Sequence, residues 1–222
     1  MSKNKIRDFY KFKSFLSKYP TIYKLALYLY KKIRNNPFGT HQFILKRILK
    51  NFQKQITIVE VGSGLNSSRI FANFAKKKNH FFYSFETNKE FFFKINRLIK
   101  NENGPNYCIN FKLVDTYDEV KKFKNHIDLL FIDSSPWASR VEMLDYFKKK
   151  AKIIIIHDCD YFPNNKIFGT VVKPFKNTKD KGHRNYDDVF KSWYEYFPER
   201  FPYKAGPPTL VGSNIVNVSK YV

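Results

Sequence analysis

The chain has 222 residues, enough for one well-filled domain and an additional segment, and a formal net charge of +22. Of its 41 Lys and Arg residues, 14 lie in residues 1–55, where Asp8 is the single acidic residue. No apolar run is long enough to cross a membrane or to form the core of a signal peptide, and Cys108 and Cys159 lack the spacing of a zinc site. We therefore expect a cytoplasmic protein, with peripheral attachment to a membrane as an alternative.

Residues 1–54 are predicted to form a basic helical cap. Helical periodicity covers residues 8–34, and after a break Thr40 is placed to begin a second helix that runs to about Lys54. The basic residues suggest contact with the phosphates of RNA or of an anionic membrane surface, although Lys is abundant along the whole chain and can be simple solvated surface. The second helix is expected to bury Phe43, Ile44, Ile48 and Phe52 and to expose Lys46, Arg47, Lys50 and Lys54.

Residues 55–222 are predicted to form an α/β domain. Short apolar runs alternate with amphipathic segments, which is the pattern of a parallel sheet built from right-handed βαβ units. The runs 127–132 and 152–156 are almost entirely apolar, as expected for strands covered on both faces. The expected fold is a Rossmann-like, doubly wound, mostly parallel sheet. The predicted strands are 56–61, 80–86, 107–114, 127–132 and 152–156, and the predicted helices are 66–78, 88–100, 117–124 and 137–149.

The C-terminal part is predicted to add a long loop and an antiparallel strand. Residues 158–182 are rich in Asn, Lys, Pro and Gly and suggest a loop over the sheet, with a short strand at 169–173. A helix is expected over 185–197. Residues 209–218 suggest two strands around a tight turn at Gly212, which would place an antiparallel strand in the sheet.

The turn after the first strand, Glu60-Val-Gly62-Ser63-Gly64, is typical of a cofactor-binding loop. Glycines allow a sharp turn and a close approach of a ligand, and the helix that opens near Asn66 offers free N–H groups. An ordinary tight βα turn has the same glycines, because short glycine motifs are not specific. The pattern favours a nucleotide-type ligand.

A carboxylate or a histidine ends each of the five predicted parallel strands. Ligands of open α/β sheets lie at this carboxyl edge, so these side chains should converge, although any one of them can instead cap a helix. Glu86 follows Gly64 by 22 residues, close to the spacing of roughly 20 at which an acid binds a ribose diol. The residues at the strand ends are Glu60, Glu86, Asp115, Asp133, His157 and Asp158.

Residues 56–218 resemble the class I S-adenosylmethionine-dependent methyltransferases. The resemblance implies S-adenosylmethionine as cofactor, with Glu60 at its amino-acid end, Glu86 at the ribose and Asp115 at the adenine. A nicotinamide enzyme is the competing interpretation, but Ser67 stands where its third glycine would be, and an acid at Glu60 is unusual there. The predicted cofactor-binding residues are Glu60, Gly62, Ser63, Gly64, Ser67, Glu86, Asp115 and Asp133.

Asp133 and Asp158 resemble the paired carboxylates with which divalent-metal O-methyltransferases hold Mg²⁺ against the acceptor. In that subgroup Asn follows the second Asp, whereas Cys159 stands here, so Asp160 would be the third ligand. His157 or Asp160 would take the acceptor proton, and Asp133, His157 and Asp158 are the predicted catalytic residues. The alternative is that His157 is a core histidine and that no metal binds.

The acceptor is expected to be a small hydroxylated molecule such as a sugar of a glycan. The Asp/Asn-Pro-Pro-aromatic motif of base-modifying methyltransferases does not occur at 133–137, which disfavours a DNA base. The alternatives are an RNA methyltransferase that uses the basic N-terminal segment and a non-catalytic module at a membrane surface. Nothing in the sequence indicates an oligomeric state. The residues expected to line the acceptor pocket are Trp137, Arg140, Tyr161, Phe162, His183, Arg184, Tyr186 and Trp193.

Overall fold

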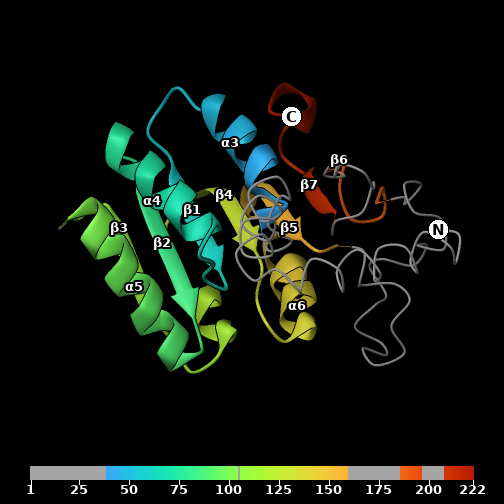
Figure 1. Cartoon of the computed structure of the whole chain (residues 1–222). Helices are drawn as coiled ribbons and strands as arrows, with labels where there is room; N and C mark the ends of the chain where they lie inside the picture. The colour runs from blue at the N-terminus through green and yellow to red at the C-terminus, as the bar shows by residue number, and fades with distance from the viewer. Residues whose placement is uncertain (1–38, 105, 160–185, 197–207) are drawn as a thin grey trace, which may run out of the picture.

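The structure is a computed structural model that describes residues 39–104, 106–159, 186–196 and 208–222 (Figure 1). The predicted helix 8–34 and strand 169–173 and almost all of the predicted loop 158–182 lie outside these residues. Among the residues described, no helix combines the length and the apolar character needed to cross a membrane.

The described strands form one seven-stranded sheet in the order β3-β2-β1-β4-β5-β7-β6. β1 to β5 are parallel, and β7 runs antiparallel to both β5 and β6, so the predicted mostly parallel sheet with an antiparallel C-terminal strand is confirmed. The chain order reverses between β1 and β4, which is where ligands bind in sheets of this kind. The strands are β1 (Thr57–Val61), β2 (Phe81–Glu86), β3 (Ile109–Leu113), β4 (Ile127–Ile132), β5 (Ala151–His157), β6 (Ser192–Tyr196) and β7 (Thr209–Ser213).

Helices cover both faces of the sheet (Figure 1). Leu129 and Phe131 of β4 face the cluster formed with α3, α4 and α5, whereas Leu130 and Ile132 face the cluster formed with α6 and η2. This alternation explains why the central strands are apolar at almost every position. The helices are α3 (Gln42–Lys50), α4 (Ser67–Lys78), α5 (Lys89–Asn103) and α6 (Trp137–Phe147), with 3₁₀ helices η2 (Tyr117–Lys122) and η4 (Val218–Lys220).

Helix α3 packs directly on the sheet, although details of its prediction were wrong. It ends at Lys50, before the predicted Lys54, and Phe43 is 61% exposed and stacks on Tyr196. The predicted burial of Ile44, Ile48 and Phe52 is confirmed, whereas Leu45 is buried in place of Phe43. Thr40 does not cap the helix, because the residue at that position is His41. The apolar face of α3 consists of Ile44, Leu45, Ile48 and Leu49, all at most 3% exposed.

The predicted helix 185–197 and the predicted hairpin 209–218 were wrong, although the antiparallel strand itself is present. Its partner is β6, whose aromatic, alternating sequence pairs with β7 and overrides the helical pattern. Gly212 lies within β7 and not in a turn. A Cβ built on Gly212 would approach the Phe190 ring to 2.2 Å, so this glycine makes room for an aromatic side chain.

Candidate functional site

The turn between β1 and α4 lies at the point where the strand order reverses. Gly62 has a φ of +86°, donates its N–H to the carbonyl of Phe85 and would place a Cβ 2.6 Å from the carbonyl oxygen of Asp133. Both the left-handed backbone and the missing space require glycine. The turn is thereby held against the ends of β2 and β4.

The side chain of Glu60 stabilises this turn through buried hydrogen bonds. Its Oε2 accepts hydrogen bonds from the hydroxyls of Ser68 (2.6 Å) and Ser84 (2.5 Å). Ser68 Oγ also accepts the N–H of Gly64, and Ser63 Oγ lies 2.7 Å from Ser84 Oγ. One buried carboxyl group therefore links β1, β2, the glycine turn and α4.

The carboxyl group of Glu60 is completely buried. Burial raises its pKa to about 8, although the hydrogen bonds of neighbouring serine hydroxyls oppose the rise. Its position at the base of the turn provides support for the loop and not a surface that a ligand can touch.

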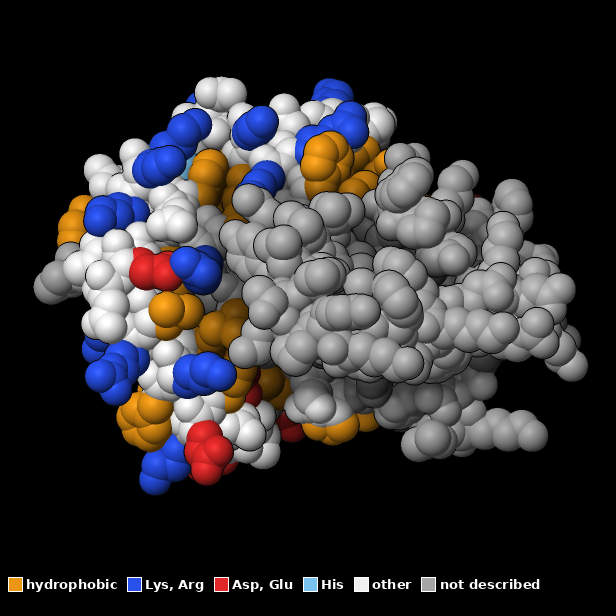
Figure 2. Space-filling model, in the orientation of Figure 1, with side chains coloured by type: hydrophobic (Ala, Val, Ile, Leu, Met, Phe, Trp, Pro, Cys, Tyr) orange, Lys and Arg blue, Asp and Glu red, His pale blue; other side chains and the backbone are white. Residues whose placement is uncertain are grey.

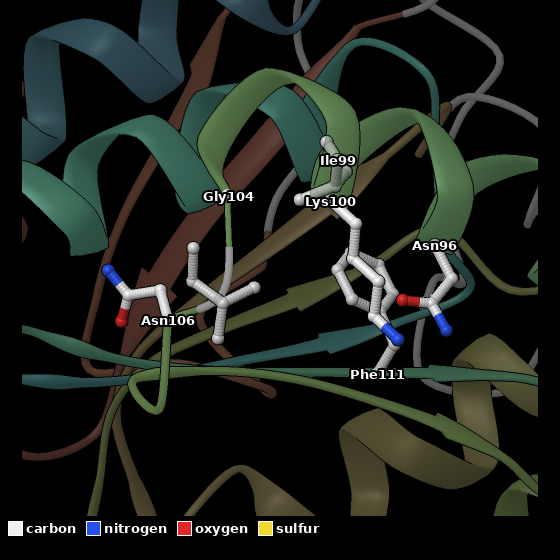
Figure 3. A pocket seen from close by; sticks show the side chains of 7 residues that line it. Asn96, Ile99, Lys100, Gly104, Asn106 and Phe111 are labelled. Atoms are coloured by element: carbon white, nitrogen blue, oxygen red, sulfur yellow. The ribbon is translucent and has the colours of Figure 1, made fainter.

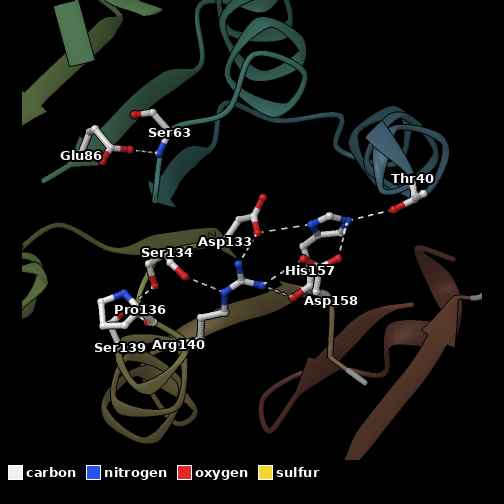
Figure 4. A network of polar contacts seen from close by, with 10 residues as sticks. All are labelled: Thr40, Ser63, Glu86, Asp133, Ser134, Pro136, Ser139, Arg140, His157 and Asp158. Carbon is white, nitrogen blue, oxygen red and sulfur yellow. Dashed lines mark hydrogen bonds and ion pairs between the residues drawn. The ribbon is translucent and has the colours of Figure 1, made fainter. Parts of the chain in front are cut away.

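Glu86 ends β2 with its carboxylate held by backbone N–H groups. Oε2 accepts from the N–H of Ser63 at 2.9 Å (Figure 4). Oε1 accepts from the N–H groups of Thr87 (2.9 Å) and Asn88 (2.8 Å). Helix α5 is capped by Asn88, so Glu86 is not its side-chain cap. Beside it, burial raises the pKa of Tyr117 to about 12, and Glu86 adds to the rise. A carboxylate fixed in this way is preorganised to accept hydrogen bonds from a ligand.

The other predicted cofactor residues lie around the same edge. A Cβ on Gly64 would approach Ser67 Oγ to 2.5 Å, and Ser67 is buried at the start of α4. Asp115 is exposed just after β3, where its backbone N–H donates to Glu119 Oε1 (2.8 Å).

A second polar cluster joins the ends of β4 and β5 (Figure 4). Arg140 of α6 lies 2.8 Å from Asp133 Oδ1 and 3.7 Å from Asp158 Oδ2. Its guanidinium also donates to the carbonyls of Ser134 and His157, both at 2.7 Å. His157 Nδ1 lies 3.3 Å from Asp133 Oδ1, and its Nε2 lies 3.3 Å from Asp158 Oδ1. The three predicted catalytic residues are therefore brought together.

Arg140 forms ion pairs with both Asp133 and Asp158. Burial alone would raise the pKa of Asp133, but the hydrogen bond and charge of His157, together with the Arg140 charge, outweigh it and hold that pKa below its ordinary value. Because the guanidinium bridges Asp133 and Asp158, the structure does not support the Mg²⁺ site predicted between them. Asp160, the expected third ligand, lies outside the described residues.

Thr40 and His41 also belong to this cluster, although no sequence pattern predicted them there. Thr40 Oγ1 lies 2.9 Å from His157 Nε2, a contact across 117 positions of the chain. The His41 ring stands edge-on to the His157 ring at 4.3 Å and is 2% exposed. Burial lowers the pKa of His41 to about 3, with a further contribution from His157, so its imidazole is neutral. No local motif marks these residues, because α3 delivers them through tertiary packing.

The residues predicted to line the acceptor pocket do not all lie at the polar cluster. Arg140 belongs to the cluster, and Trp137 begins α6. Tyr186 is buried in the core, where its hydroxyl donates to Glu195 Oε1 (3.0 Å), so it forms no open surface, and the partly buried Trp193 packs against its ring. Tyr161, Phe162, His183 and Arg184 lie outside the described residues.

Two hollows lie away from this edge. A groove of about 650 Å³ runs between α3 and α4, and Figure 2 shows Lys and Arg side chains spread over this side of the molecule. None of the described residues that line the groove is acidic. A smaller cavity of about 280 Å³ lies between α5 and the edge strand β3, beside Ile99 and Phe111 (Figure 3). The groove is lined by Lys46, Arg47, Lys50, Arg69 and Lys77, with Phe43 and Leu65 among its apolar residues.

The strand order and the antiparallel β7 give the chain the Rossmann-like fold of the class I S-adenosylmethionine-dependent methyltransferases. No protein-family model matches the sequence, and no curated protein matches it. Similar solved structures include a spermidine synthase in complex with the transition-state analogue AdoDATO, with a TM-score of 0.57 and 13% identity over 83% of this chain and 64% of the other. The spermidine synthase of Thermotoga maritima has a TM-score of 0.55 and 13% identity over 83% and 62% of the two chains. A methyltransferase from Pyrococcus furiosus has a TM-score of 0.48 and 16% identity over 79% and 83%. The chain thus spans less than two thirds of either spermidine synthase, and identities this low establish the fold alone.

Proposed function

We propose that the protein is an S-adenosylmethionine-dependent methyltransferase. The observation that carries this proposal is the Glu86 carboxylate, which three backbone N–H groups hold beside the glycine turn at the switch point of the sheet. In this fold that position suits the ribose of an adenosyl group. Gly62, Ser63 and Gly64 would accommodate the rest of the cofactor, with Glu60 and Ser67 as support beneath the turn and Asp115 at the adenine.

The proposed acceptor is a hydroxyl group of a small molecule such as a sugar. Methyl transfer is an in-line displacement, for which an enzyme aligns the two reactants and excludes water. The acceptor hydroxyl must also lose a proton. Asp133, His157 and Asp158 lie together at the adjacent strand ends, and their imidazole and carboxylates are groups of the kind that accept such a proton.

Calorimetric titration with S-adenosylhomocysteine tests the cofactor site. We expect saturable binding to the wild-type protein and at least about tenfold weaker binding to Glu86→Gln, because a buried hydrogen bond to a charged group contributes about 1.5–3 kcal/mol. The matched control is Glu142→Gln, an exposed acid on α6, which should bind like the wild type. Binding of NAD instead of S-adenosylhomocysteine, or equal binding by wild type and Glu86→Gln, would contradict the proposal.

Spermidine synthesis is a second candidate. It is favoured by the two spermidine synthases, the reported neighbours with TM-scores above 0.5. Formation of spermidine by the purified protein, with no methyl transfer from S-adenosylmethionine to any hydroxylated acceptor, would select this candidate.

RNA as the methyl acceptor is a third candidate, favoured by the groove between α3 and α4. Five basic side chains and exposed apolar side chains line the groove, a combination that suits phosphates and stacked bases. An anionic membrane surface shares the phosphate chemistry but would use the basic side chains without base stacking.

A further inference from the structure

Two histidines and one carboxylate meet beside the cofactor edge. One ligand atom from each of His41, Asp133 and His157 lies within 4.8 Å of the other two. His41 and His157 are 2% and 4% exposed, whereas the Asp133 side chain is 21% exposed and leaves a side open to solvent. In the part of the chain that the structure describes, this is the one group of three potential metal ligands.

His41 lacks the hydrogen bonds that a buried imidazole requires. Among the residues that the structure describes, neither Nδ1 nor Nε2 has a hydrogen-bond partner, although both atoms are buried. By contrast the buried His80 has one partner, because its Nδ1 accepts the backbone N–H of Ile56, and only its Nε2 has none among the described residues. A buried polar group left without a hydrogen-bond partner destabilises the folded protein by about 1–3 kcal/mol. A ligand that binds the His41 imidazole would remove this cost.

The contacts of His157 fix which nitrogen faces the cluster. Its Nδ1 faces Asp133, and its Nε2 lies 2.9 Å from Thr40 Oγ1 and 3.3 Å from Asp158 Oδ1. With an ion bound at Nδ1 in place of the hydrogen bond to Asp133, the ring would be neutral and Nε2 would donate its proton to Thr40 Oγ1. Orientation of a ligand histidine through its other nitrogen is the usual arrangement at metal sites.

The separation of His157 Nδ1 and Asp133 Oδ1 matches two atoms bound to one ion. The two atoms are 3.3 Å apart, a hydrogen bond that is longer than the roughly 2.7–2.9 Å of a typical charged N–H···O bond. Two ligands with bonds of about 2.0–2.1 Å to a tetrahedral ion lie roughly 3.3 Å apart.

The charge of Arg140 does not make this cluster cationic. Its guanidinium lies 2.8 Å from Asp133 Oδ1, but Asp158 pairs with it from the other side at 3.7 Å. Two carboxylates and one guanidinium together contribute one net negative charge to the cluster.

We propose that His41, Asp133 and His157 form a binding site for a divalent transition-metal cation of the Zn²⁺, Co²⁺ or Fe²⁺ type. Two imidazole nitrogens and one carboxylate select such ions over Mg²⁺, which prefers oxygen ligands. Three protein ligands leave a coordination position for water or substrate. The proposal depends on these three side chains and not on the function proposed above.

Metal titration of the tag-free full-length protein tests the site. We expect one Zn²⁺ per chain by calorimetry and a visible absorption band when Co²⁺ binds, whereas Mg²⁺ should not compete. His41→Ala and Asp133→Asn should each weaken Zn²⁺ binding at least tenfold, and Thr40→Val, which frees His157 Nε2, should weaken it about tenfold or more. The matched control is His126→Ala, because His126 is an exposed histidine away from the cluster and its removal should leave binding unchanged.

Two further measurements make the outcome decisive. Thermal unfolding of each variant checks that it is folded, and the wild-type titration stands without any variant. No saturable Zn²⁺ or Co²⁺ binding by the wild type, unchanged binding by His41→Ala, or loss of binding in His126→Ala would overturn the proposal.

S-adenosylhomocysteine binding is measured on the same samples. We expect it to survive His41→Ala, because the cofactor residues lie on β1 and β2, so failure of the metal site and failure of the cofactor site are distinguished.

Discussion

Among single residues, Glu60 has a protonation state that depends most clearly on its surroundings. Its carboxyl group is fully buried with two serine hydroxyls on one oxygen and no hydrogen-bond partner on the other. Burial therefore raises its pKa from 4.5 to about 8, so the folded protein keeps a proton that the unfolded chain has already released at neutral pH.

This difference predicts how stability depends on pH. The contribution of protonated Glu60 to the free energy of unfolding is fully present below pH 4.5. It is lost as pH rises toward 8, because the folded state binds more protons than the unfolded chain in that pH range. The slope contributed by one group is at most about 1.4 kcal/mol per pH unit. Glu60→Gln, which is always neutral, should remove that slope, as measured by urea unfolding at a series of pH values.

The exposed acid Glu142 provides the control, because Glu142→Gln should unfold with the same pH dependence as the wild type. Parallel stability curves for the wild type and Glu60→Gln between pH 5 and 8 would mean that Glu60 is ionised in the folded protein.

The residues of the site differ in how far the sequence could predict them. Asp133 follows β4, His157 is the last residue of β5 and Asp158 follows it, and a common edge of the sheet is enough to bring them together. His41 could not be predicted in this way, because its position depends on how α3 docks on the sheet. The same holds for Glu60, whose motif matches a cofactor loop but whose carboxyl group lies beneath it.

At the scale of elements, strands with an apolar run and a local crossover helix were predictable, and the last two strands were not. β6 contains Trp193, Tyr194 and Tyr196, which suit a strand, but only the presence of β7 as an antiparallel partner decides between strand and helix. Gly212 suggested a turn because glycine is common there. Its actual role, space for the ring of Phe190, is a tertiary contact that no local pattern contains.

The contact between β7 and Phe190 gives a prediction for this pair. Gly212→Ala should destabilise the protein by about 1–3 kcal/mol, because the new Cβ would lie within 2.2–2.5 Å of three ring atoms of a side chain that is 1% exposed. In a protein of this size the loss corresponds to a decrease in Tm of several degrees. Thermal unfolding measures it.

Phe190→Leu combined with Gly212→Ala is the matched test. The smaller side chain should relieve the clash, so the double variant should be more stable than the sum of the two single changes predicts. Strict additivity would show that the ring and the glycine do not restrict one another.

At the scale of the whole molecule, the charge distribution predicts how RNA would bind. Single-stranded RNA should bind the wild type with a steep salt dependence if the groove between α3 and α4 contacts its phosphates. Replacing Lys46, Arg47 and Lys50 with Gln should reduce the slope of log K against log salt by about 2, since each phosphate contact contributes about 0.7 for single strands. Fluorescence anisotropy over a range of salt concentrations measures the slope.

The control removes the same charge from the opposite side, by replacing Lys122, Lys124 and Lys149, which are exposed on and near η2 and α6. An equal reduction of the slope in both triple variants would indicate a general attraction to a basic protein. Binding to anionic vesicles but not to RNA would select a membrane surface as the partner of the groove.

Helix α3 belongs at once to the hydrophobic core and, through Thr40 and His41, to the polar cluster at the strand ends. Transient detachment of this one helix would therefore dismantle the histidine side of the site, while the glycine turn and Glu86, which belong to β1 and β2, would keep their contacts. We therefore expect the two halves of the site to open independently. A ligand that bridges them would slow hydrogen exchange in α3 even where it touches no atom of that helix.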